Sequence, residues 1–511
     1  MSLIAFVVVT FGFAGTAIVL RARTPWATVV GLLGLVAAVV AAQVMNPAES
    51  IVIGSGSGSG ALATTAYIRL FLVLGSVAGL ALGIAGLASG SRRDAPAVTL
   101  VVLGTAGLTM GLVDPRAAVL VATAGGLFGV FVTLVPSGGR AGATIGIRET
   151  RAVVVAGTLA IAATAWIGRD LSQLSAQPVV FGLAYFAFVI AVAMRFGAIP
   201  FHLWAARLAD VVPETALPVL TALAPASLAV VALAWIDASV APLALDLGPF
   251  RGLVLAIALA SIVLAAVAAF VQDDLEHVLG YSIVGDAGVI ILALAALSPD
   301  AWTPARTWIL SYIVARSAFA AWTAGVRSAF FTGRVADLRG WARRSPVLAV
   351  AFGLVMIATV GFPGLATFEA RTALVRLSLD GPLATVIGLA MLAPLLYYGR
   401  LLAIGLARPD GVVRAAEAWS PRVRPPDVTQ TRRWLRGTWN DNRAFTTAVT
   451  AALLGVLAVA TSAGAFGGPA AAAGLPPGIS TPGEVVEPIG SDVLPPGQES
   501  AAPSVAPSAA P

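Results

Sequence analysis

The sequence has no cysteine, no lysine and only two histidines, His202 and His277, among its 511 residues. Without cysteine, the chain cannot form disulfides, cysteine-ligated zinc sites or iron–sulfur clusters. The two histidines lie in different segments without other candidate ligands near them, so we predict no metal site, no haem and no other cofactor. Without lysine, all 31 basic residues are arginines, and an arginine stays protonated at neutral pH because its pKa lies above about 12.

Charged residues of either sign are scarce in this chain. They make up 11% of the sequence, whereas hydrophobic residues make up 58% and the mean hydropathy is +0.92. A helix needs about 20 mostly apolar residues to cross a bilayer. We therefore predict an all-α, polytopic membrane protein of about fourteen transmembrane helices. The predicted spans begin near Leu3, Trp26, Leu70, Ala95, Ala117, Ala152, Phe181, Ala216, Leu253, Val278, Trp308, Val347, Pro382 and Ala444.

Most loop arginines fall on one side of the membrane when the loops are assigned alternately to its two sides. Among them are Arg140, Arg148 and Arg151, which we place in a loop before the sixth predicted span. Because short cytoplasmic loops are enriched in arginine, this side is predicted to be cytoplasmic, with both termini on the outer side of the plasma membrane. The same distribution explains the pI near 10.4, so we predict no nucleic-acid partner.

Composition divides the chain into three parts. Residues 1–466 hold the apolar runs and form the predicted transmembrane domain. Within it, residues 408–443 mix arginines with tryptophans, which favours either an interfacial cytoplasmic segment or a solvated basic loop near anionic lipid. Residues 467–511 are rich in proline, alanine, serine and glycine and predict a disordered outer tail, and GSGSGSG at residues 54–60 predicts a flexible outer loop.

Several charged residues lie inside the apolar runs. A charge in the middle of a bilayer costs about 2.5 to 3.5 kcal/mol or more, so each one is a candidate for function. These residues are Arg195 and His202 in the seventh predicted span, Asp286 in the tenth, Arg316 in the eleventh, and Glu369 and Arg371 in the twelfth, with Glu276 and His277 at the end of the tenth.

Two prolines accompany these charges, Pro200 in PFHLW and Pro363 in GFPGLATFEAR. Proline removes a backbone donor and frees a carbonyl, which the membrane tolerates only where protein or water satisfies the backbone. We expect both prolines to break their helices beside polar cavities. A kink that only aids packing is the alternative.

Three stretches together resemble the antiporter-like membrane subunits of respiratory complex I, the NADH:quinone oxidoreductase, of chain N or M type. PFHLW, followed by Asp210, Pro213 and Pro218, resembles the PFHxW stretch of that family, and QDDLEHVLGYSIVGDAG and GFPGLATFEAR are similar to its tenth- and twelfth-helix motifs. The resemblance covers residues 181–407. It implies two inverted repeats with broken seventh and twelfth helices, other membrane-arm subunits and the lipid bilayer as partners, and proton translocation without redox chemistry in this chain.

The chain departs from the family at the titratable groups that the resemblance implies. Arg195 and Arg371 replace the lysines of the seventh and twelfth helices, and the lysine of the eighth falls at Leu228. The fifth span has no acid, and the family's glutamate falls near Gly125 or Gly126. In the tenth span, Glu276 and His277 replace a basic pair, and Asp286 replaces a histidine.

Protons therefore have few carriers in this chain. The titratable candidates for the core are His202, Asp286 and Glu369, and we expect Arg316 to pair with Asp286 or Glu369 because an unpaired buried arginine is costly. Static ion pairs and a rewired path of acids and histidines stay open. For His202, a hydrogen bond to a backbone carbonyl and a proton-shuttle role both stay open.

Three functions follow from these patterns. The first is a membrane-arm subunit of a complex I-like NADH:quinone oxidoreductase that takes part in proton translocation. The second is a paralogue that no longer conducts and serves as a structural scaffold. The third is a subunit of a cation/proton antiporter or a membrane-bound hydrogenase, which share the same motifs.

Overall fold

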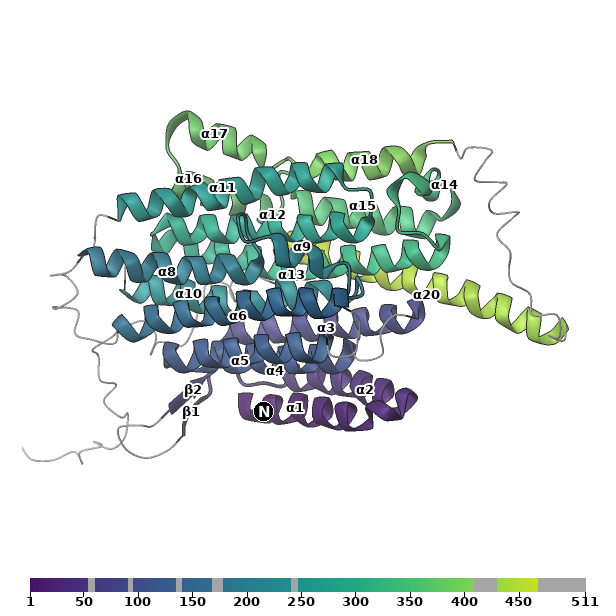
Figure 1. Ribbon diagram of the computed structural model, residues 1–511, viewed down its shortest axis with the longest axis horizontal. Coiled ribbons are helices and arrows are strands. Elements are labelled where there is room, and N and C mark those ends of the chain that lie inside the picture. Colours follow the sequence, from purple (N-terminus) through teal and green to yellow (C-terminus); the bar gives the residue numbers. More distant parts are fainter. Residues whose placement is uncertain are drawn as a thin grey trace, which may run out of the picture.

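The computed structural model describes residues 1–53, 60–90, 95–134, 140–167, 178–239, 247–408 and 430–466. These residues form one bundle of roughly parallel helices, with one short hairpin of strands β1 (Ser50–Ile53) and β2 (Gly60–Ala63) beside it (Figure 1). The predicted GSGSGSG loop, most of the interfacial segment and the tail lie outside the described residues, apart from Gly60. Residues 430–443 form the first turns of the last helix.

The first six predicted spans correspond to six helices packed at one edge of the bundle. They are α1 (Leu3–Val19), α2 (Thr24–Gln43), α3 (Ala66–Ser89), α4 (Ala95–Gly111), α5 (Pro115–Leu134) and α6 (Arg140–Ile167). The next spans form α8 (Pro178–Phe196), the short α9 (Leu203–Leu208), the π-helix η3 (Val219–Leu223), α10 (Ala224–Ser239), α11 (Gly248–Val271) and α12 (Leu275–Ala296).

The remaining helices surround α13. They are α13 (Trp302–Phe330), the short α14 (Trp341–Arg344), α15 (Pro346–Val360), α16 (Ala366–Ser378), α17 (Gly381–Ala390), α18 (Pro394–Leu406) and α20 (Gln430–Ser462), with single 3-10 turns η1 (Leu20–Ala22), η5 (Pro299–Ala301) and η6 (Val335–Leu338). α13 packs against α3, α12, α15, α16 and α20. It is therefore the central helix of this part of the bundle.

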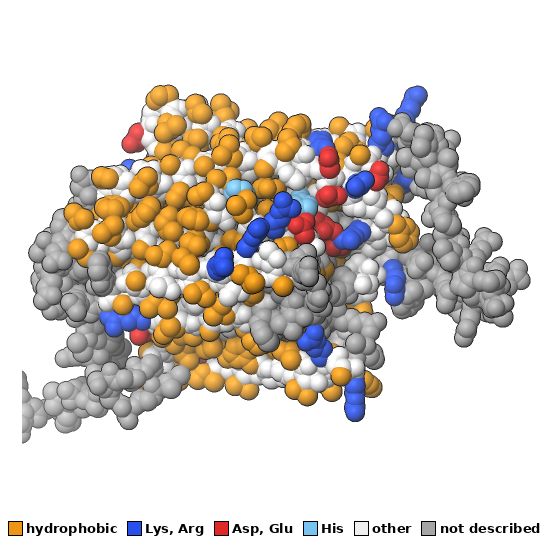
Figure 2. Space-filling view, in the orientation of Figure 1, with side chains coloured by type: hydrophobic (Ala, Val, Ile, Leu, Met, Phe, Trp, Pro, Cys, Tyr) orange, Lys and Arg blue, Asp and Glu red, His pale blue; other side chains and the backbone are white. Residues whose placement is uncertain are grey.

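The prediction of an all-α, polytopic membrane protein is confirmed. Among the described residues, ten helices are long and apolar enough to cross a membrane, and three shorter apolar helices accompany them, so the predicted count of fourteen is not itself confirmed. A helix satisfies its own backbone hydrogen bonds, which is why apolar chains cross lipid in this form. On the face that Figure 2 shows, most of the coloured side chains are hydrophobic.

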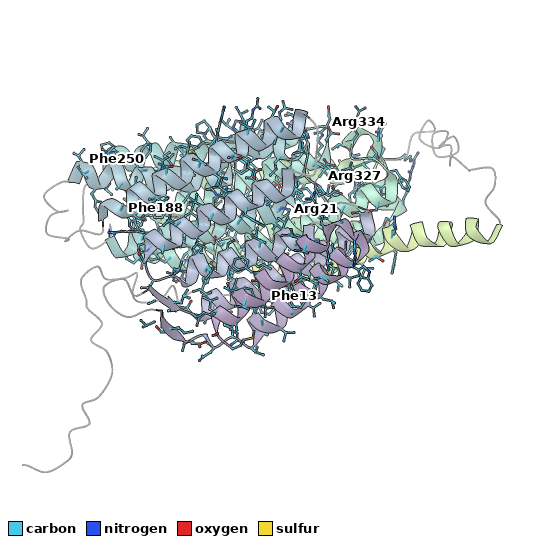
Figure 3. The ribbon with its side chains drawn as sticks, turned by 60° about the horizontal axis from the view of Figure 1, so that its bottom comes forward. Phe13, Arg21, Phe188, Phe250, Arg327 and Arg334 are labelled. Carbon is cyan, nitrogen blue, oxygen red and sulfur yellow. The ribbon has the colours of Figure 1, made fainter. Side chains whose placement is uncertain are left out.

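Charged side chains gather at one end of the bundle, which we call the charged end (Figure 2). Arg327 and Arg334 lie toward this end, and Phe250 lies toward the other (Figure 3). The arrangement agrees with the arginine distribution in the sequence. Which side of the membrane the charged end faces stays a prediction.

The seventh span is broken between α8 and α9. α8 ends at Phe196, and Gly197 follows with a φ of +64°, a value that glycine adopts without strain. Pro200 lies in the turn that follows. The indole Nε1 of Trp204 donates to the carbonyl of Met194 at 3.0 Å, so a side chain of the PFHLW stretch satisfies a carbonyl at the end of α8.

The twelfth span is broken between α15 and α16, and Pro363 lies in the break. Gly361 ends α15 with a φ of +62°. A Cβ atom at this position would lie 2.6 Å from the guanidinium of Arg371. Glycine is therefore required here both for the backbone conformation and for the close approach of Arg371.

Candidate functional site

Arg195 lies in the last turn of α8, with 6% of its surface exposed. It faces Gly126 of α5, where an added Cβ would lie 2.7 Å from the guanidinium Nη2. Gly126 is one of the two positions at which the family's fifth-helix glutamate was expected. The guanidinium thus occupies the space that a side chain at residue 126 would need.

Glu149 of α6 supplies a carboxyl near this arginine. It is 3% exposed, its Oε2 has no hydrogen-bond partner among the described residues, and it interacts electrostatically with Arg195. Arg195 likewise has no hydrogen bond or ion pair with the described part of the chain. Two opposite charges therefore face each other in the interior without direct contact, an arrangement that water commonly bridges.

The placement of Arg148 and Arg151 in a loop was wrong, and this error hid Glu149. α6 begins at Arg140, so both arginines and the glutamate are helical. Val153, Ala156 and Ala160 follow Glu149 at spacings of four, seven and eleven residues and are fully buried. That helical spacing is the sequence signal that places Glu149 on the buried face of α6.

Asp286 of α12 and Arg316 of α13 form a buried ion pair. The Nε of Arg316 donates to Oδ2 of Asp286 at 2.6 Å, and Nη2 lies against the same oxygen. Arg316 is completely buried and also donates to the hydroxyl of Tyr398 at 3.2 Å. The expectation that Arg316 pairs with a nearby acid is confirmed, and the acid is Asp286.

Arg371 binds backbone instead of an acid. Its Nη1 donates to the carbonyl of Met391 at 3.2 Å and its Nη2 to that of Gly361 at 3.1 Å. These residues end α17 and α15. The guanidinium also lies 5.2 Å from the ring centre of Trp308. Arg371 thus satisfies the carbonyls at the ends of two half-helices. It does so with two nitrogens of one planar guanidinium group, which lysine does not have.

A cavity of about 20 Å³ separates Asp286 from Arg371, enough for one water molecule. Tyr281 also lines this cavity, and the ring of His202 lies 6.1 Å from that of Tyr281. The Nδ1 of His202 is buried and makes no hydrogen bond with any described residue. Of the two alternatives for His202, the hydrogen bond to a backbone carbonyl is therefore not seen at this nitrogen.

Glu369 does not join the buried charges, contrary to our expectation that it belongs to the core. It is exposed, whereas Arg371 is buried. Two residues along an α-helix turn the side chain by about 200°, so one of this pair faces outward when the other faces inward. Glu369 has no ion pair with Arg316 or with any other described residue.

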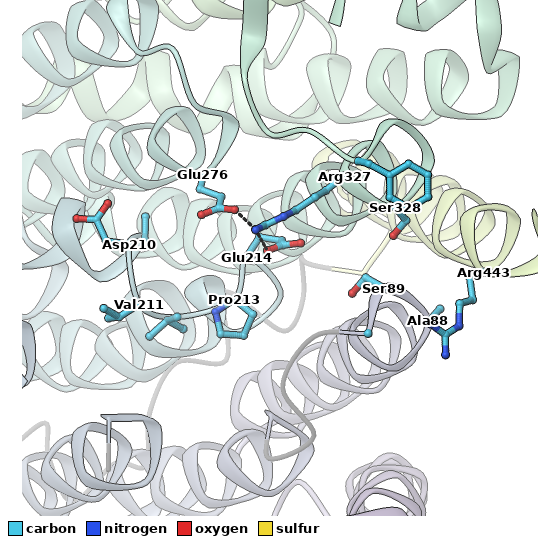
Figure 4. A pocket seen from close by; sticks show the side chains of 14 residues that line it. Ala88, Ser89, Asp210, Val211, Pro213, Glu214, Glu276, Arg327, Ser328 and Arg443 are labelled. Carbon is cyan, nitrogen blue, oxygen red and sulfur yellow. Dashed lines mark hydrogen bonds and ion pairs between the residues drawn. The ribbon is translucent and has the colours of Figure 1, made fainter. Parts of the chain in front are cut away.

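A cavity of about 520 Å³ opens at the charged end. Arg327 of α13 bridges two glutamates on its wall, Glu214 at 3.3 Å and Glu276 in closer contact (Figure 4). Beside them, the Nε2 of His277 lies 3.1 Å from Oδ1 of Asp210. Glu214 escaped the sequence analysis because it follows Pro213 in a connecting segment, yet it is 2% exposed.

A series of aliphatic contacts links this cavity to the surroundings of Arg195. Val211 lines the cavity and packs against a small cluster of Val130 and Val153. Val153 is also the nearest neighbour of Gly126 after Arg195. Val211 and Val153 thus connect the wall of the cavity with the side of α5 that Arg195 contacts.

Metal ligands do not gather in the described part of the chain, where no three histidine, aspartate or glutamate side chains come together.

Known proteins are similar to this chain in sequence and in fold. Residues 155–396 match the family described as NADH:quinone oxidoreductase/Mrp antiporter. Subunit N 1 of the NADH-quinone oxidoreductase of Streptomyces griseus is 28% identical over 452 residues, which cover 83% of this chain and 87% of that protein. Subunit N of Halorhodospira halophila is 31% identical over 244 residues, 46% of this chain and 49% of that protein.

Two solved structures have the same fold. A chain of the Mrp complex from Dietzia has a TM-score of 0.72 at 18% identity and covers 93% of this chain and 98% of its own length. A chain of respiratory complex I from Thermus thermophilus has a TM-score of 0.63 at 16% identity, covering 89% and 97%. Over residues 155–396 the chain is thus similar to the NADH:quinone oxidoreductase/Mrp antiporter family, and its fold is that of chains in the Mrp complex and in respiratory complex I.

Proposed function

We propose that this chain is a membrane-arm subunit of a bacterial NADH:quinone oxidoreductase and takes part in proton translocation coupled to electron transfer, with Glu149 as the proton carrier of its first half. The observation that carries the proposal is the buried Glu149 beside Arg195, each without a direct partner among the described residues. Relatives named as subunit N of this enzyme support the choice of complex.

Arg195 and Glu149 differ in whether they can exchange a proton. Arginine does not release its proton at neutral pH, because a pKa above 12 makes neutralisation cost more than about 7 kcal/mol. Glu149 can exchange a proton, and Arg195 supplies a fixed positive charge that attracts the carboxylate. A proton on Glu149 would come from the acids of the cavity at the charged end, carried by water that enters past Val211, because aliphatic side chains cannot transfer a proton.

The non-conducting scaffold is the second candidate, and the second half of the chain favours it. Arg316 and Asp286 are joined by a direct hydrogen bond, and Arg371 donates hydrogen bonds to two backbone carbonyls. Neither arrangement offers an exchangeable proton without breaking strong contacts. The antiporter alternative has support from the fold of the Mrp complex chain, but the named relatives of this chain favour the oxidoreductase.

The test is Glu149→Gln in the intact complex, in sealed membrane vesicles driven by NADH. We expect NADH oxidation to continue and the number of protons moved per NADH to fall. Asp380→Asn is the matched control, because Asp380 is an exposed acid between two half-helices, and it should change neither quantity. An unchanged proton ratio in Glu149→Gln would favour the scaffold and refute the role of Glu149.

Both termini are proposed to lie on the outer side of the membrane, with the charged end in the cytoplasm. The distribution of loop arginines supports this orientation. The interfacial role of residues 408–443 and the outer tail at 467–511 are proposals of the same kind, based on composition alone.

A further inference from the structure

A groove lies on the outside of the bundle between α6 and α8, which pack side by side (Figure 1). Its volume is about 350 Å³, and it is lined only by leucine, isoleucine, phenylalanine and alanine side chains, among them Leu159 and Ala162 of α6 and Leu183 and Ile190 of α8. Leu183 is 47% exposed and Ala162 is exposed as well, so the groove is open. An open apolar groove on a membrane protein is a candidate binding site.

Two arginines lie on the same face of α6 as this groove. Arg148 precedes Leu159 by eleven residues, and Arg151 precedes Ala162 by the same number. Eleven residues are close to three turns of an α-helix, so each arginine lies in line with a residue of the groove, about 16 Å away along the helix. Both arginines are exposed, and neither forms an ion pair with a described residue.

The chemistry of these arginines favours a phosphate group as their partner. An exposed carboxyl can become neutral by binding a proton, but arginine keeps its positive charge at neutral pH. A guanidinium group binds phosphate through two parallel hydrogen bonds. Arg148 and Arg151 are three residues apart and therefore neighbours on the helix surface. Two such cations in line with an apolar groove match a molecule that has a phosphate head and a hydrocarbon tail.

The distances along α6 agree with the length of one lipid. The arginines lie on the side of the groove toward the charged end, because Glu149 beside them interacts with Arg195 at the end of α8, from which the chain continues into the charged-end cavity. From Arg148 to Ala163, the last groove residue of α6, the helix extends about 22 Å. One leaflet of a bilayer, headgroups included, is about 20 to 22 Å thick. A lipid with its phosphate at the arginines therefore has its acyl chains beside the groove.

The groove is too narrow for a helix of a neighbouring subunit. Leu183 and Ile190 are about 10 Å apart along α8, so a volume of about 350 Å³ corresponds to a cross-section of roughly 35 Å². A helix with its side chains is about 10 to 12 Å in diameter, which is a cross-section of roughly 80 Å² or more. An acyl chain is much thinner than a helix and fits the groove along its length.

We propose that the α6–α8 groove, Arg148 and Arg151 form a binding site for one anionic phospholipid, with its phosphate at the two arginines and an acyl chain in the groove. The lipid neutralises the two arginines from outside the bundle, whereas Glu149, which lies between them in the sequence, faces Arg195 in the interior. The proposal concerns lipid binding alone and does not depend on the proposed role of the chain in proton translocation.

Quenching by brominated lipids measures whether the groove selects an anionic headgroup. The chain has no cysteine, so Leu183→Cys provides a single site for a fluorophore in the groove of the purified full-length chain. In phosphatidylcholine vesicles, we expect phosphatidylglycerol brominated on its acyl chains to quench this fluorophore several-fold more strongly than brominated phosphatidylcholine at the same mole fraction. Leu264→Cys on α11 is the control and should show no preference, because Leu264 is 52% exposed and the one arginine of α11, Arg251, donates to backbone carbonyls.

Charge variants test the two arginines in the same assay. We expect Arg148→Gln combined with Arg151→Gln to remove the preference for phosphatidylglycerol in the groove. Arg148→Lys combined with Arg151→Lys should retain part of it, because lysine keeps the charge but not the planar guanidinium. Arg343→Gln, at an exposed arginine of α14, is the matched control and should leave the preference unchanged. Equal quenching by the two lipids when both arginines are present, or an unchanged preference in the double glutamine variant, would refute the site.

A photo-crosslinking amino acid in place of Leu183 identifies the occupant of the groove in the cell membrane. We expect a product whose mass is that of the chain plus one phospholipid. A crosslink to another protein would show that a neighbour covers the groove, and it would overturn the proposal. The proposed function is judged separately, by the number of protons moved per NADH in Glu149→Gln.

Discussion

Replacing Arg371 tests whether this arginine is a fixed clamp or a member of a proton path. In the structure its guanidinium donates at 3.1 and 3.2 Å to carbonyls that end two different half-helices. A hydrogen bond to a charged group contributes about 1.5 to 3 kcal/mol. Arg371→Met removes both bonds and should lower the free energy of unfolding by about 3 to 6 kcal/mol. Arg371→Lys can keep one bond and should lose about half as much.

Unfolding of the detergent-solubilised protein, followed by tryptophan fluorescence, measures this loss. Trp308, one of the eleven tryptophans, lies 5.2 Å from the guanidinium, so part of the emission comes from the site. Arg376→Lys is the matched control, since Arg376 belongs to the same helix but is exposed and contacts no carbonyl that the structure describes. The reasoning fails if Arg371→Lys and Arg371→Met are both as stable as the control.

Two further predictions concern the buried ion pair and the orientation of the chain. Asp286→Asn should destabilise the protein by about 3 to 5 kcal/mol, because it leaves Arg316 buried without a counter-charge, and the double variant Asp286→Leu with Arg316→Met should recover most of that loss in the same unfolding assay. Additive losses would show that the two residues do not act as a pair. The absence of cysteine makes single-cysteine labelling clean: a membrane-impermeant maleimide should react with Asp300→Cys in intact cells and with Arg207→Cys only after the cells are opened. The reverse pattern would invert the proposed topology.

The sequence predicted those features that the bilayer itself enforces. Arg316 had to find an acid because an unpaired charge is costly in lipid, and Asp286 was one of only two candidates. Pro200 and Pro363 marked the two breaks because proline cannot continue the backbone ladder. These inferences needed only composition and the physics of the membrane.

Residues whose burial depends on which face of a helix they occupy were missed or assigned to the wrong side of the helix. Glu149 was hidden because Arg148 and Arg151 beside it look like loop residues, although its spacing to Val153 and Ala156 continues a buried stripe. Glu369 was assigned to the core because it is two residues from Arg371, but that separation places the two side chains on opposite faces of α16. Charge patterns locate a span, and only the phase of the helix decides which charges point inward.

Arg195, Arg316 and Arg371, three of the four buried arginines among the described residues, differ in what balances their charge. Arg316 is balanced by a carboxylate in direct contact, and Arg371 by backbone carbonyls. Arg195 is left with Glu149 at longer range. A proton that binds Asp286 must first break a hydrogen-bonded ion pair, whereas a proton that binds Glu149 finds an oxygen without a hydrogen bond. We therefore propose that proton exchange in this lysine-free chain rests with a carboxylate and not with a cation, in the half of the chain where that carboxylate is not already held by hydrogen bonds.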